Sequence, residues 1–341
     1  MMGQTLMAKV TQNRQRAGFG GVSSRSFVPG LALYTGSDHM TVPGLDADIA
    51  PTHGQKAKAA TDVAAPASVT MPMSFGRKGT LEVLIATTPA EIDAAQALRY
   101  HVFYEEMSAI PDETTRATRR DADRFDAFCD HLLVIDHALT GGEEGGPFRP
   151  EAVVGCYRLL RQSVANQNGG FYTASEFEIE PLLKRAGPDM QFLELGRSCV
   201  LPPYRNRPTV ELLWHGIANY VASRNLDVMF GCASFETTDP ASIAIPLSYL
   251  YHFHMAPDDW HVRALPDRFV EMNLLPKDEI NPRHAWRMLP PMIKGYVRAG
   301  CYIGDGAVID RQFGTTDVLI LFPVAQISER YATKFGSTPN S

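Results

Sequence analysis

The sequence predicts an α/β domain with a central sheet flanked by helices. From about residue 79, segments typical of strands alternate with segments typical of helices. A strand-like run at 192–201, FLELGRSCVL, leads through a proline-broken basic turn into a long amphipathic helix. The chain has 341 residues, of which 45% are apolar, so it can bury a sizeable core. Together these observations favour a globular protein.

The first 78 residues lack this alternation. They are rich in Gly, Ser, Thr, Ala and Pro, so we expect residues 1–78 to form a disordered N-terminal extension. The folded domain is expected at 79–333, less regular from about residue 257, with a polar tail at 334–341. No stretch has the roughly 20 consecutive apolar residues that a membrane-spanning helix needs. The net charge of −6 gives no overall basic field, so a nucleic-acid partner is not expected.

The domain begins with a strand and a capped helix. LEVLIAT at 81–87 has the composition of a strand, and the capping box TPAE at 88–91 starts a helix that continues to Met107. The charged segment 108–130 is predicted to be a loop with helical turns.

The middle of the domain is predicted to hold a hairpin and a short helix. Apolar runs at 131–137 and 152–161 flank a glycine-rich turn, which indicates a pair of antiparallel strands. Thr173 or Ser175 is expected to cap a helix that ends before Gly187.

The remaining elements repeat the order of strand and helix. The strand at 192–201 precedes a helix at 209–225, and a strand at 228–235 precedes a helix that starts at Pro240. Beyond residue 256 the segments are mixed, and a last strand, DVLILFPV, is expected before the tail.

The strand at 192–201 carries an acid and a base. Glu194 and Arg197 lie three residues apart and face opposite sides of an ideal strand, but a bulge at Gly196 would turn both into one cleft. A carboxylate in such a place can have a pKa suited to a general base. The alternative interpretation is a structural ion pair between the two side chains.

The turn after this strand is cationic. Arg205 and Arg207 stand at the entry of the following helix, where the backbone N–H groups and the helix dipole favour an anion. The alternative is that both arginines are ordinary solvated turn residues.

Five further residues are candidates for substrate contacts. Arg99 and Phe103 lie four apart on one helix and share a face, and Arg158 interrupts an apolar strand, where it needs a carboxylate or a ligand as partner. Asp126 and Asp130, also four apart, would receive an ammonium jointly if their segment were helical. Otherwise they are surface acids.

The remaining polar motifs predict no metal site and no thiol nucleophile. His252 and His254 lack a third ligand at a suitable spacing, so we expect core or surface histidines rather than zinc ligands. GDG at 304–306 is only a weak turn signal. The five cysteines are widely spaced and contain no CxxC pair, which favours buried, reduced thiols in a cytoplasmic protein.

Several blocks, in order, carry a resemblance to a known family. These blocks are LRYHVFYEEM, FDAFCDHLLV, VVGCYRLL, FLELGRSCVLPPYRNR and PPMIKGYVRAGCYIGDGAVIDRQFGTTDVLI. From about residue 79 to about residue 333 the chain resembles the L-ornithine Nα-acyltransferases of bacterial ornithine-lipid synthesis. That family belongs to the Gcn5-related acyltransferase superfamily and is similar to acyl-homoserine-lactone synthases.

The resemblance also implies which residues act in the site. The shared pattern is an Arg, a Phe four residues later, two acids, a further Arg and a Glu-x-x-Arg strand. The matching positions in this sequence are Arg99, Phe103, Asp126, Asp130, Arg158, Glu194 and Arg197. Glu194 would be the base, and Arg197 would orient the donor. Asp126 and Asp130 would bind ammonium groups, and Arg99 or Arg158 the carboxylate of ornithine.

The implied reaction transfers a 3-hydroxyacyl group from acyl carrier protein to the α-amine of L-ornithine and gives lyso-ornithine lipid. No bound cofactor is expected, because the acyl phosphopantetheine thioester is a co-substrate. The alternatives are an acyl-homoserine-lactone synthase-like enzyme, another amino-acid N-acyltransferase, for example one using glycine, and a nonenzymatic acyl-carrier or lipid-binding protein. The product is amphiphilic, so peripheral contact with the inner membrane is a further expectation.

One departure from the superfamily concerns the acyl donor. Acetyl-CoA enzymes of the superfamily have a glycine-rich turn after the central strand, whereas this chain has YRNRPT at 204–209. A turn without glycine does not let the backbone close around a pyrophosphate. The resemblance and this departure together favour acyl carrier protein, contacted by Arg205 and Arg207, over coenzyme A.

Overall fold

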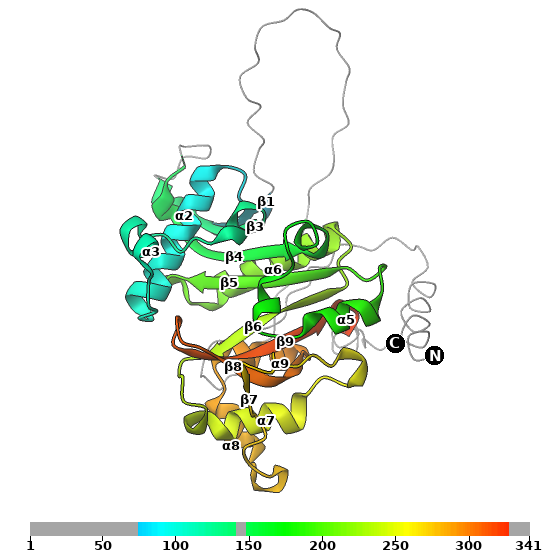
Figure 1. The fold of residues 1–341 in the computed structure, drawn as a ribbon. Coiled ribbons are helices and arrows are strands. Elements are labelled where there is room, and N and C mark those ends of the chain that lie inside the picture. Colours follow the sequence, from blue (N-terminus) through cyan, green and yellow to red (C-terminus); the bar gives the residue numbers. More distant parts are fainter. Residues whose placement is uncertain (1–73, 141–147, 327–341) are drawn as a thin grey trace, which may run out of the picture.

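A single mixed sheet forms the centre of the protein. The computed structural model describes residues 74–140 and 148–326, and nine strands in this part follow the order β1-β2-β3-β4-β5-β6-β9-β8-β7 (Figure 1). Neighbouring strands are antiparallel except β5 and β6, which are parallel. Residues 1–73 of the predicted extension and the predicted tail lie outside the described residues. Strand β1, Ser74–Lys78, precedes the predicted start at residue 79.

The first predicted elements are confirmed. Strand β2 covers Leu81–Ile85, and helix α2 covers Pro89–Tyr100. Thr88 and Glu91 form the predicted capping box, in which each side chain accepts a hydrogen bond from the backbone N–H of the other end. The predicted helix continues as a π-helix, η1, over His101–Glu106.

The charged segment and the hairpin also match their predictions. Helix α3, Glu113–Thr118, and the 3-10 turn η2, Arg124–Ala127, lie in the segment predicted to contain helical turns. Strands β3, Asp130–Asp136, and β4, Val153–Arg161, pair antiparallel.

The predicted cap of the next helix is wrong. Thr173 and Ser175 lie in the 3-10 turn η5, Tyr172–Ser175, and helix α5 starts only at Ile179 and ends at Ala186. Glu178 occupies the N-cap position without a side-chain cap. The carboxylate of Glu194 holds this turn by accepting hydrogen bonds from its backbone.

The central strand and helix pairs follow the predicted order. Strand β5, Phe192–Val200, leads through the turn η6, Pro202–Tyr204, into helix α6, Arg207–Ser223. Asn206 caps α6, since its side chain accepts from the N–H of Thr209. The next pair is completed by strand β6, Val228–Phe235, and helix α7, Ala244–His254.

The C-terminal part adds two strands that the sequence analysis did not predict. Its elements are β7 (Phe269–Val270), α8 (Pro282–Met288), α9 (Pro291–Ala299), β8 (Tyr302–Asp310) and β9 (Thr315–Pro323). The GDG motif lies inside β8, where the register shifts between Ile303 and Ala307. Gly306 has a φ of 82°, and a Cβ there would meet the ring of Phe269, so the bulge requires glycine.

The two faces of the sheet are covered by different helices. In β2, Val83 and Ile85 belong to the core beneath α6, whereas Leu84 on the opposite face packs with residues of α2. A third cluster of apolar side chains joins η5 and α5 to β6, β8 and β9. In Figure 1, α7 and α8 lie together at the β7 end of the sheet.

Candidate active site

The bulge predicted at Gly196 is present in β5. Arg158 pairs with Gly196 and Cys156 pairs with Cys199, so β5 has one extra residue opposite β4. Arg197 sits in the left-handed region with a φ of 51°, which is uncommon for a residue other than glycine. Such a backbone persists only where surrounding contacts hold it.

Strands β5 and β6 separate just before this bulge. Their parallel pairing covers only Phe192–Glu194 against Val228–Phe230. At the next position Gly231 closely approaches the carbonyl of Leu195, and a Cβ there would lie 2.2 Å from that oxygen. Glycine is therefore required where the strands begin to part.

An apolar pocket lies where the strands part. It is small, with a cavity volume of about 20 Å³, and its lining joins β5, β6 and β9 to α6 and α9. The lining residues are Leu195, Trp214, Met229, Phe230, Gly231, Cys232, Tyr296, Ile320 and Phe322. A cavity of this size holds about one water molecule, so an acyl chain or a pantetheine arm enters it only if the strands part further.

Arg99 is the centre of a buried ion-pair network. The side chain is 1% exposed, and its guanidinium donates to Asp121 Oδ2 at 2.7 Å and to both oxygens of Asp126 at 2.9 Å. It also donates to the backbone carbonyl of Asp121. These contacts tie α2 to the segment that precedes β3.

Two more arginines from neighbouring strands join this network. Arg158 donates to Asp123 at 2.7 Å and lies 3.4 Å from Asp126, which confirms the expectation that it faces a carboxylate. Arg197 donates to Asp121 at 3.1 Å and to Asp123 at 3.3 Å. The bulge residue Arg197 is thus held in place by two acids.

The network balances its own charge. Three arginines meet three aspartates, and burial alone would raise the pKa of Asp126, but Arg99 and Arg158 lower it below its usual value. The guanidinium groups of Arg99 and Arg158 and the carboxylate of Asp126 are therefore already engaged within the protein. The ligand-binding roles predicted for these three residues remain predictions.

Asp130 and Asp126 do not act together in this structure. Asp126 lies in the turn η2, whereas Asp130 is the first residue of β3, so the helical spacing on which their pairing depended is absent there. Asp130 accepts a hydrogen bond from the hydroxyl of Tyr220, and Arg161 Nε lies 3.5 Å from its carboxylate.

Phe103 lies beside Arg197 rather than deep in the core. Its ring packs edge-on against Phe313 with centroids 5.5 Å apart. Arg197 stacks on the same Phe313 ring at 5.0 Å and on Tyr172 at 4.9 Å. The rings of Tyr172 and Phe313 therefore flank the Arg197 guanidinium, and Phe103 packs against Phe313.

Glu194 is buried and holds the turn η5. Its two oxygens accept hydrogen bonds from the backbone N–H groups of Tyr172 at 2.9 Å and Thr173 at 2.6 Å. Burial raises the pKa of Glu194, while these hydrogen bonds oppose the rise. Arg197 pairs with Asp121 and Asp123, so the structural alternative of an ion pair with Glu194 is not the arrangement seen.

Arg205 and Arg207 lie at the surface near the start of α6. Arg205 makes a two-pronged ion pair with Glu106, and Arg207 pairs with Glu211 one turn along the helix. The arginine side chains are 40% and 54% exposed. Exposed ion pairs of this kind contribute little stability, so a partner with acidic groups can replace the glutamates.

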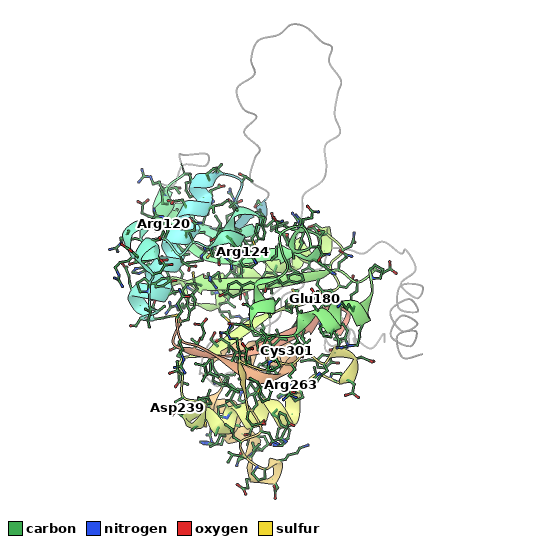
Figure 2. All side chains as sticks on the ribbon, in the orientation of Figure 1. Arg120, Arg124, Glu180, Asp239, Arg263 and Cys301 are labelled. Atoms are coloured by element: carbon green, nitrogen blue, oxygen red, sulfur yellow. The ribbon has the colours of Figure 1, made fainter. Side chains whose placement is uncertain are left out.

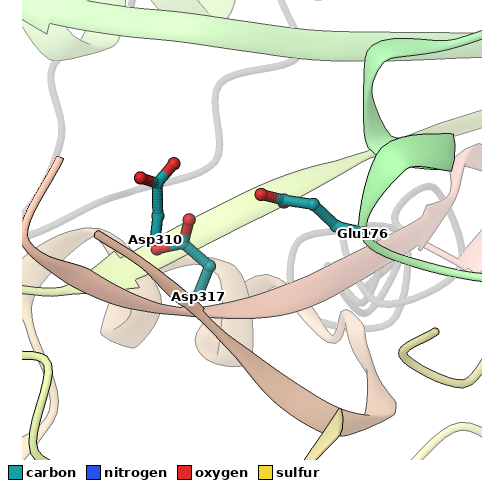
Figure 3. A group of neighbouring side chains, drawn as sticks. All are labelled: Glu176, Asp310 and Asp317. Atoms are coloured by element: carbon teal, nitrogen blue, oxygen red, sulfur yellow. The ribbon is translucent and has the colours of Figure 1, made fainter. Parts of the chain in front are cut away.

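Three acidic residues that the sequence analysis missed meet beside the pocket. Glu176 follows η5, Asp310 ends β8 and Asp317 lies in β9, and their carboxylates point toward one another (Figure 3). One oxygen from each lies within 4.8 Å of the others. No local spacing relates them, because the sheet brings together three distant segments. We refer to them below as the acidic cluster.

Among the described residues, the possible metal-ligand atoms that lie close together belong to the acidic cluster and not to His252 or His254. Oxygens of its three carboxylates are close enough to ligate one ion. His252 Nε2 instead makes a hydrogen bond with the carbonyl of Leu275 at 2.9 Å.

The thiols have the environment of structural cysteines. Cys129, Cys156, Cys199 and Cys301 are buried, and Cys232 is partly so. Burial raises the pKa of the Cys199 and Cys232 thiols well above the usual value, which disfavours the nucleophilic thiolate.

Removing the guanidinium of Arg99 should lower the stability of the folded protein. We expect Arg99→Met to lower the free energy of unfolding by about 3–5 kcal/mol, because it removes the buried cation that bridges Asp121 and Asp126. Urea denaturation followed by circular dichroism measures this loss. Arg120, labelled in Figure 2, pairs with Asp93 at the surface, so Arg120→Met should cost under about 1 kcal/mol. Equal losses for the two variants would contradict the account of the network.

The acidic cluster should cost stability at alkaline pH. Burial, with Asp317 nearby, raises the pKa of Glu176 from 4.5 to about 7. The folded state therefore holds this proton more tightly than the unfolded state, and stability falls as pH rises from about 4.5 to about 7. We expect Glu176→Gln to stabilise the fold by about 1–3 kcal/mol at pH 8 relative to its effect at pH 5. Denaturation of both proteins at the two pH values checks this, and a pH-independent difference would refute it.

Comparisons with known proteins identify the family. The Acetyltransferase (GNAT) domain matches residues 98–215, and with the mixed sheet and flanking helices it confirms the predicted fold class. An N-acyl amino acid synthase from uncultured soil microbes, FeeM, covers 73% of this chain and 93% of its own, at 13% identity and a TM-score of 0.40.

The sequence relatives carry the assignment. The L-ornithine N(alpha)-acyltransferase of Brucella abortus (strain 2308) is 50% identical over 266 residues, which are 78% of this chain and 92% of the relative. That of Rhizobium meliloti (strain 1021) is 50% identical over 275 residues, 81% of this chain and 89% of the relative. The chain is thus an N-acyltransferase, and it belongs to the L-ornithine N(alpha)-acyltransferase family.

Proposed function

We propose that the protein transfers a 3-hydroxyacyl group from acyl carrier protein to the α-amine of L-ornithine, and that the product is lyso-ornithine lipid. One observation carries the acceptor: relatives of about 50% identity that match nearly their whole length are named L-ornithine N(alpha)-acyltransferase. The apolar pocket and the cationic entry to α6 support an acyl donor on a carrier.

The pocket between β5 and β6 is where we place the acyl thioester. The amine attacks the thioester carbonyl directly in a ternary complex, so no protein nucleophile is needed. Backbone N–H groups between Gly196 and Cys199, in the bulge of β5, are proposed to stabilise the oxyanion of the tetrahedral intermediate. Arg197 is proposed to orient the donor from that bulge.

An α-amine with a pKa near ~8 is partly protonated at neutral pH, so the reaction needs a base. Glu194 is the candidate that the sequence analysis gave. Both of its oxygens accept backbone hydrogen bonds here, so a base role requires at least one of these bonds to be exchanged for substrate or water. That role is tested below against another carboxylate.

Arg205 and Arg207 are proposed to contact the carrier. The turn after β5 has no glycine, and its two exposed arginines offer charge for the phosphopantetheine phosphate and the acidic carrier surface. These features favour acyl carrier protein over coenzyme A as donor. No other bound cofactor enters the proposal.

The enzymatic alternatives differ in the amine. In these alternatives the amine of another amino acid, such as glycine, or of the acceptor of an acyl-homoserine-lactone synthase would attack the same thioester. Family membership sets aside the nonenzymatic alternative, a protein that only binds lipid or carrier.

We also propose a cytoplasmic site of action with peripheral contact at the inner membrane. No helix among the described residues has the length and apolarity to cross a bilayer. Exposed apolar side chains on α7, α8 and α9, namely Phe253, Met288 and Met292, support contact with lipid, where the amphiphilic product would be released.

The acceptor is tested by following thiol release from 3-hydroxyacyl carrier protein. We expect release that depends on L-ornithine, with a product whose mass equals that of ornithine plus the 3-hydroxy fatty acid less one water. Release that depends on glycine or another amine and not on ornithine would overturn the proposed acceptor. Replacing the carrier by the matching acyl-coenzyme A should slow the reaction at least tenfold, and equal rates would overturn the proposed donor.

The carrier site is tested by charge reversal. Arg205→Glu with Arg207→Glu should weaken carrier binding by tenfold or more and leave the thermal midpoint nearly unchanged, because both side chains are exposed. Arg119→Glu, at another exposed position, is the matched control and should keep wild-type affinity. Full affinity in the double variant would place the docking surface elsewhere.

A further inference from the structure

The acidic cluster has more negative charge than its surroundings neutralise. Arg268 is the cation paired with it, and its guanidinium lies 3.6 Å from Glu176. Asp310 accepts hydrogen bonds from the backbone N–H groups of Gln312 and Phe313. Among residues 74–140 and 148–326, three carboxylates thus share one arginine, in contrast to the balanced network around Arg99. An unbalanced group of acids favours a bound cation.

One oxygen of the acidic cluster has no partner. Within the described residues, Oδ1 of Asp317 makes no hydrogen bond, although the residue is only 7% exposed. The carboxylate of Asp317 points toward Glu176 in Figure 3. Burial raises the pKa of Asp317, although the side chains of Ser234 and Thr315 oppose the rise. A ligand that donates a hydrogen bond to Oδ1 would satisfy this oxygen and favour the carboxylate form.

The acidic cluster and the pocket in which we place the thioester lie on opposite faces of strand β6. Most side chains of the pocket lining belong to the core beneath α6, whereas Cys232, which also borders the pocket, packs on the other face and donates its thiol hydrogen to Oε2 of Glu176 at 3.3 Å. Glu176 belongs to the segment held by Glu194, which lies on β5 where the strands part. A group bound to the acidic cluster therefore stands beside the position at which the strands open.

We propose that the acidic cluster of Glu176, Asp310 and Asp317 binds the ammonium groups of the acceptor amino acid, and that Glu176 accepts the proton from the attacking α-amine. The inference rests on the proposed function, because it needs an amine acceptor and a thioester in the pocket. It assigns Glu194 to a positioning role, in which its carboxylate holds the turn that presents Glu176.

The chemistry of L-ornithine matches this cluster. At neutral pH the molecule carries two ammonium groups, each with three N–H donors and no acceptor, like the side chain of lysine. The carboxylates supply acceptors only. A cation at the acidic cluster also places the amine beside the thioester, which is the positioning that direct attack requires.

The proposed step balances in protons. Glu176 takes one proton from the α-ammonium and leaves a neutral amine. The amine nitrogen forms a bond to the thioester carbonyl carbon, and the carbon–sulfur bond breaks. A second nitrogen proton passes to the departing thiolate, which leaves as the carrier thiol, and the amide keeps the third. Glu176 then returns its proton to solvent.

The test compares steady-state kinetics of single variants with L-ornithine and 3-hydroxyacyl carrier protein. Asp317→Asn and Asp310→Asn should raise the KM for ornithine at least tenfold and change kcat less. Glu176→Gln should lower kcat at least 100-fold while the KM for the carrier stays as in the wild type. Glu180→Gln, an exposed acid on α5 labelled in Figure 2, is the matched control and should behave like the wild type.

A second measurement keeps a fold defect apart from a binding defect. Titration calorimetry with L-ornithine alone should show binding to the wild type and to Glu180→Gln, and none to Asp317→Asn. The thermal midpoint of each variant shows whether it is folded. Wild-type kinetics in both Glu176→Gln and Asp317→Asn would overturn the inference, as would a kcat loss confined to Glu194→Gln.

The outcomes also separate the inference from the proposed function. If the wild type acylates another amine and not ornithine, the proposed acceptor fails, and the same variants measured with that amine still test the acidic cluster. If Mg²⁺ or Mn²⁺ raises the thermal midpoint of the wild type but not of Asp317→Asn, and ornithine binding is unchanged in the variant, the cluster is a metal site and the inference fails.

Discussion

The separation of β5 from β6 is the constraint on which the rest of the site depends. The two strands pair in parallel for three residues, and then Gly231 meets the Leu195 carbonyl and the bulge at Arg197 turns β5 away. Backbone groups that would otherwise close the sheet are left to face a pocket. A ligand can reach the middle of a sheet only where its ladder is interrupted in this way.

Two groups of acids differ in how far neighbouring cations compensate their charge. Asp121, Asp123 and Asp126 meet three arginines, and this network fixes the strained backbone of Arg197. In the part of the chain that the structure describes, the acidic cluster of Glu176, Asp310 and Asp317 pairs with one arginine, and Oδ1 of Asp317 makes no hydrogen bond. The first group is suited to supporting the backbone. The second group leaves negative charge uncompensated, which is the property expected of a site that binds a cation.

Features that depend on neighbouring residues were predictable from the sequence. The capping box at Thr88, the hairpin and the bulge at Gly196 are each specified by a few adjacent side chains. Strand β8 was missed because its glycines, which serve a bulge packed on Phe269, also resemble a turn. The pairing of Asp126 with Asp130 assumed a helix where the chain makes a short turn and enters a strand.

The acidic cluster could not be predicted from the sequence, because its three residues are close together only in the folded chain. Glu176, Asp310 and Asp317 are ordinary acids in their local sequence, and only the pairing of β8 with β9 and the docking of η5 bring them together. A buried carboxylate oxygen that makes no hydrogen bond can be recognised only when the fold is known. Resemblance to a family found the strand and the arginines, but it did not supply this second group of acids.

A crystal structure with L-ornithine and an unreactive thioether analogue of the acylated phosphopantetheine arm tests the account most directly. The account predicts the α-amino nitrogen within about 3 Å of Glu176 and beside the thioether carbon, with an ammonium hydrogen-bonded to Asp317. An α-amino nitrogen bound at Glu194 or at Asp123, with the acidic cluster empty or holding a metal ion, would contradict it.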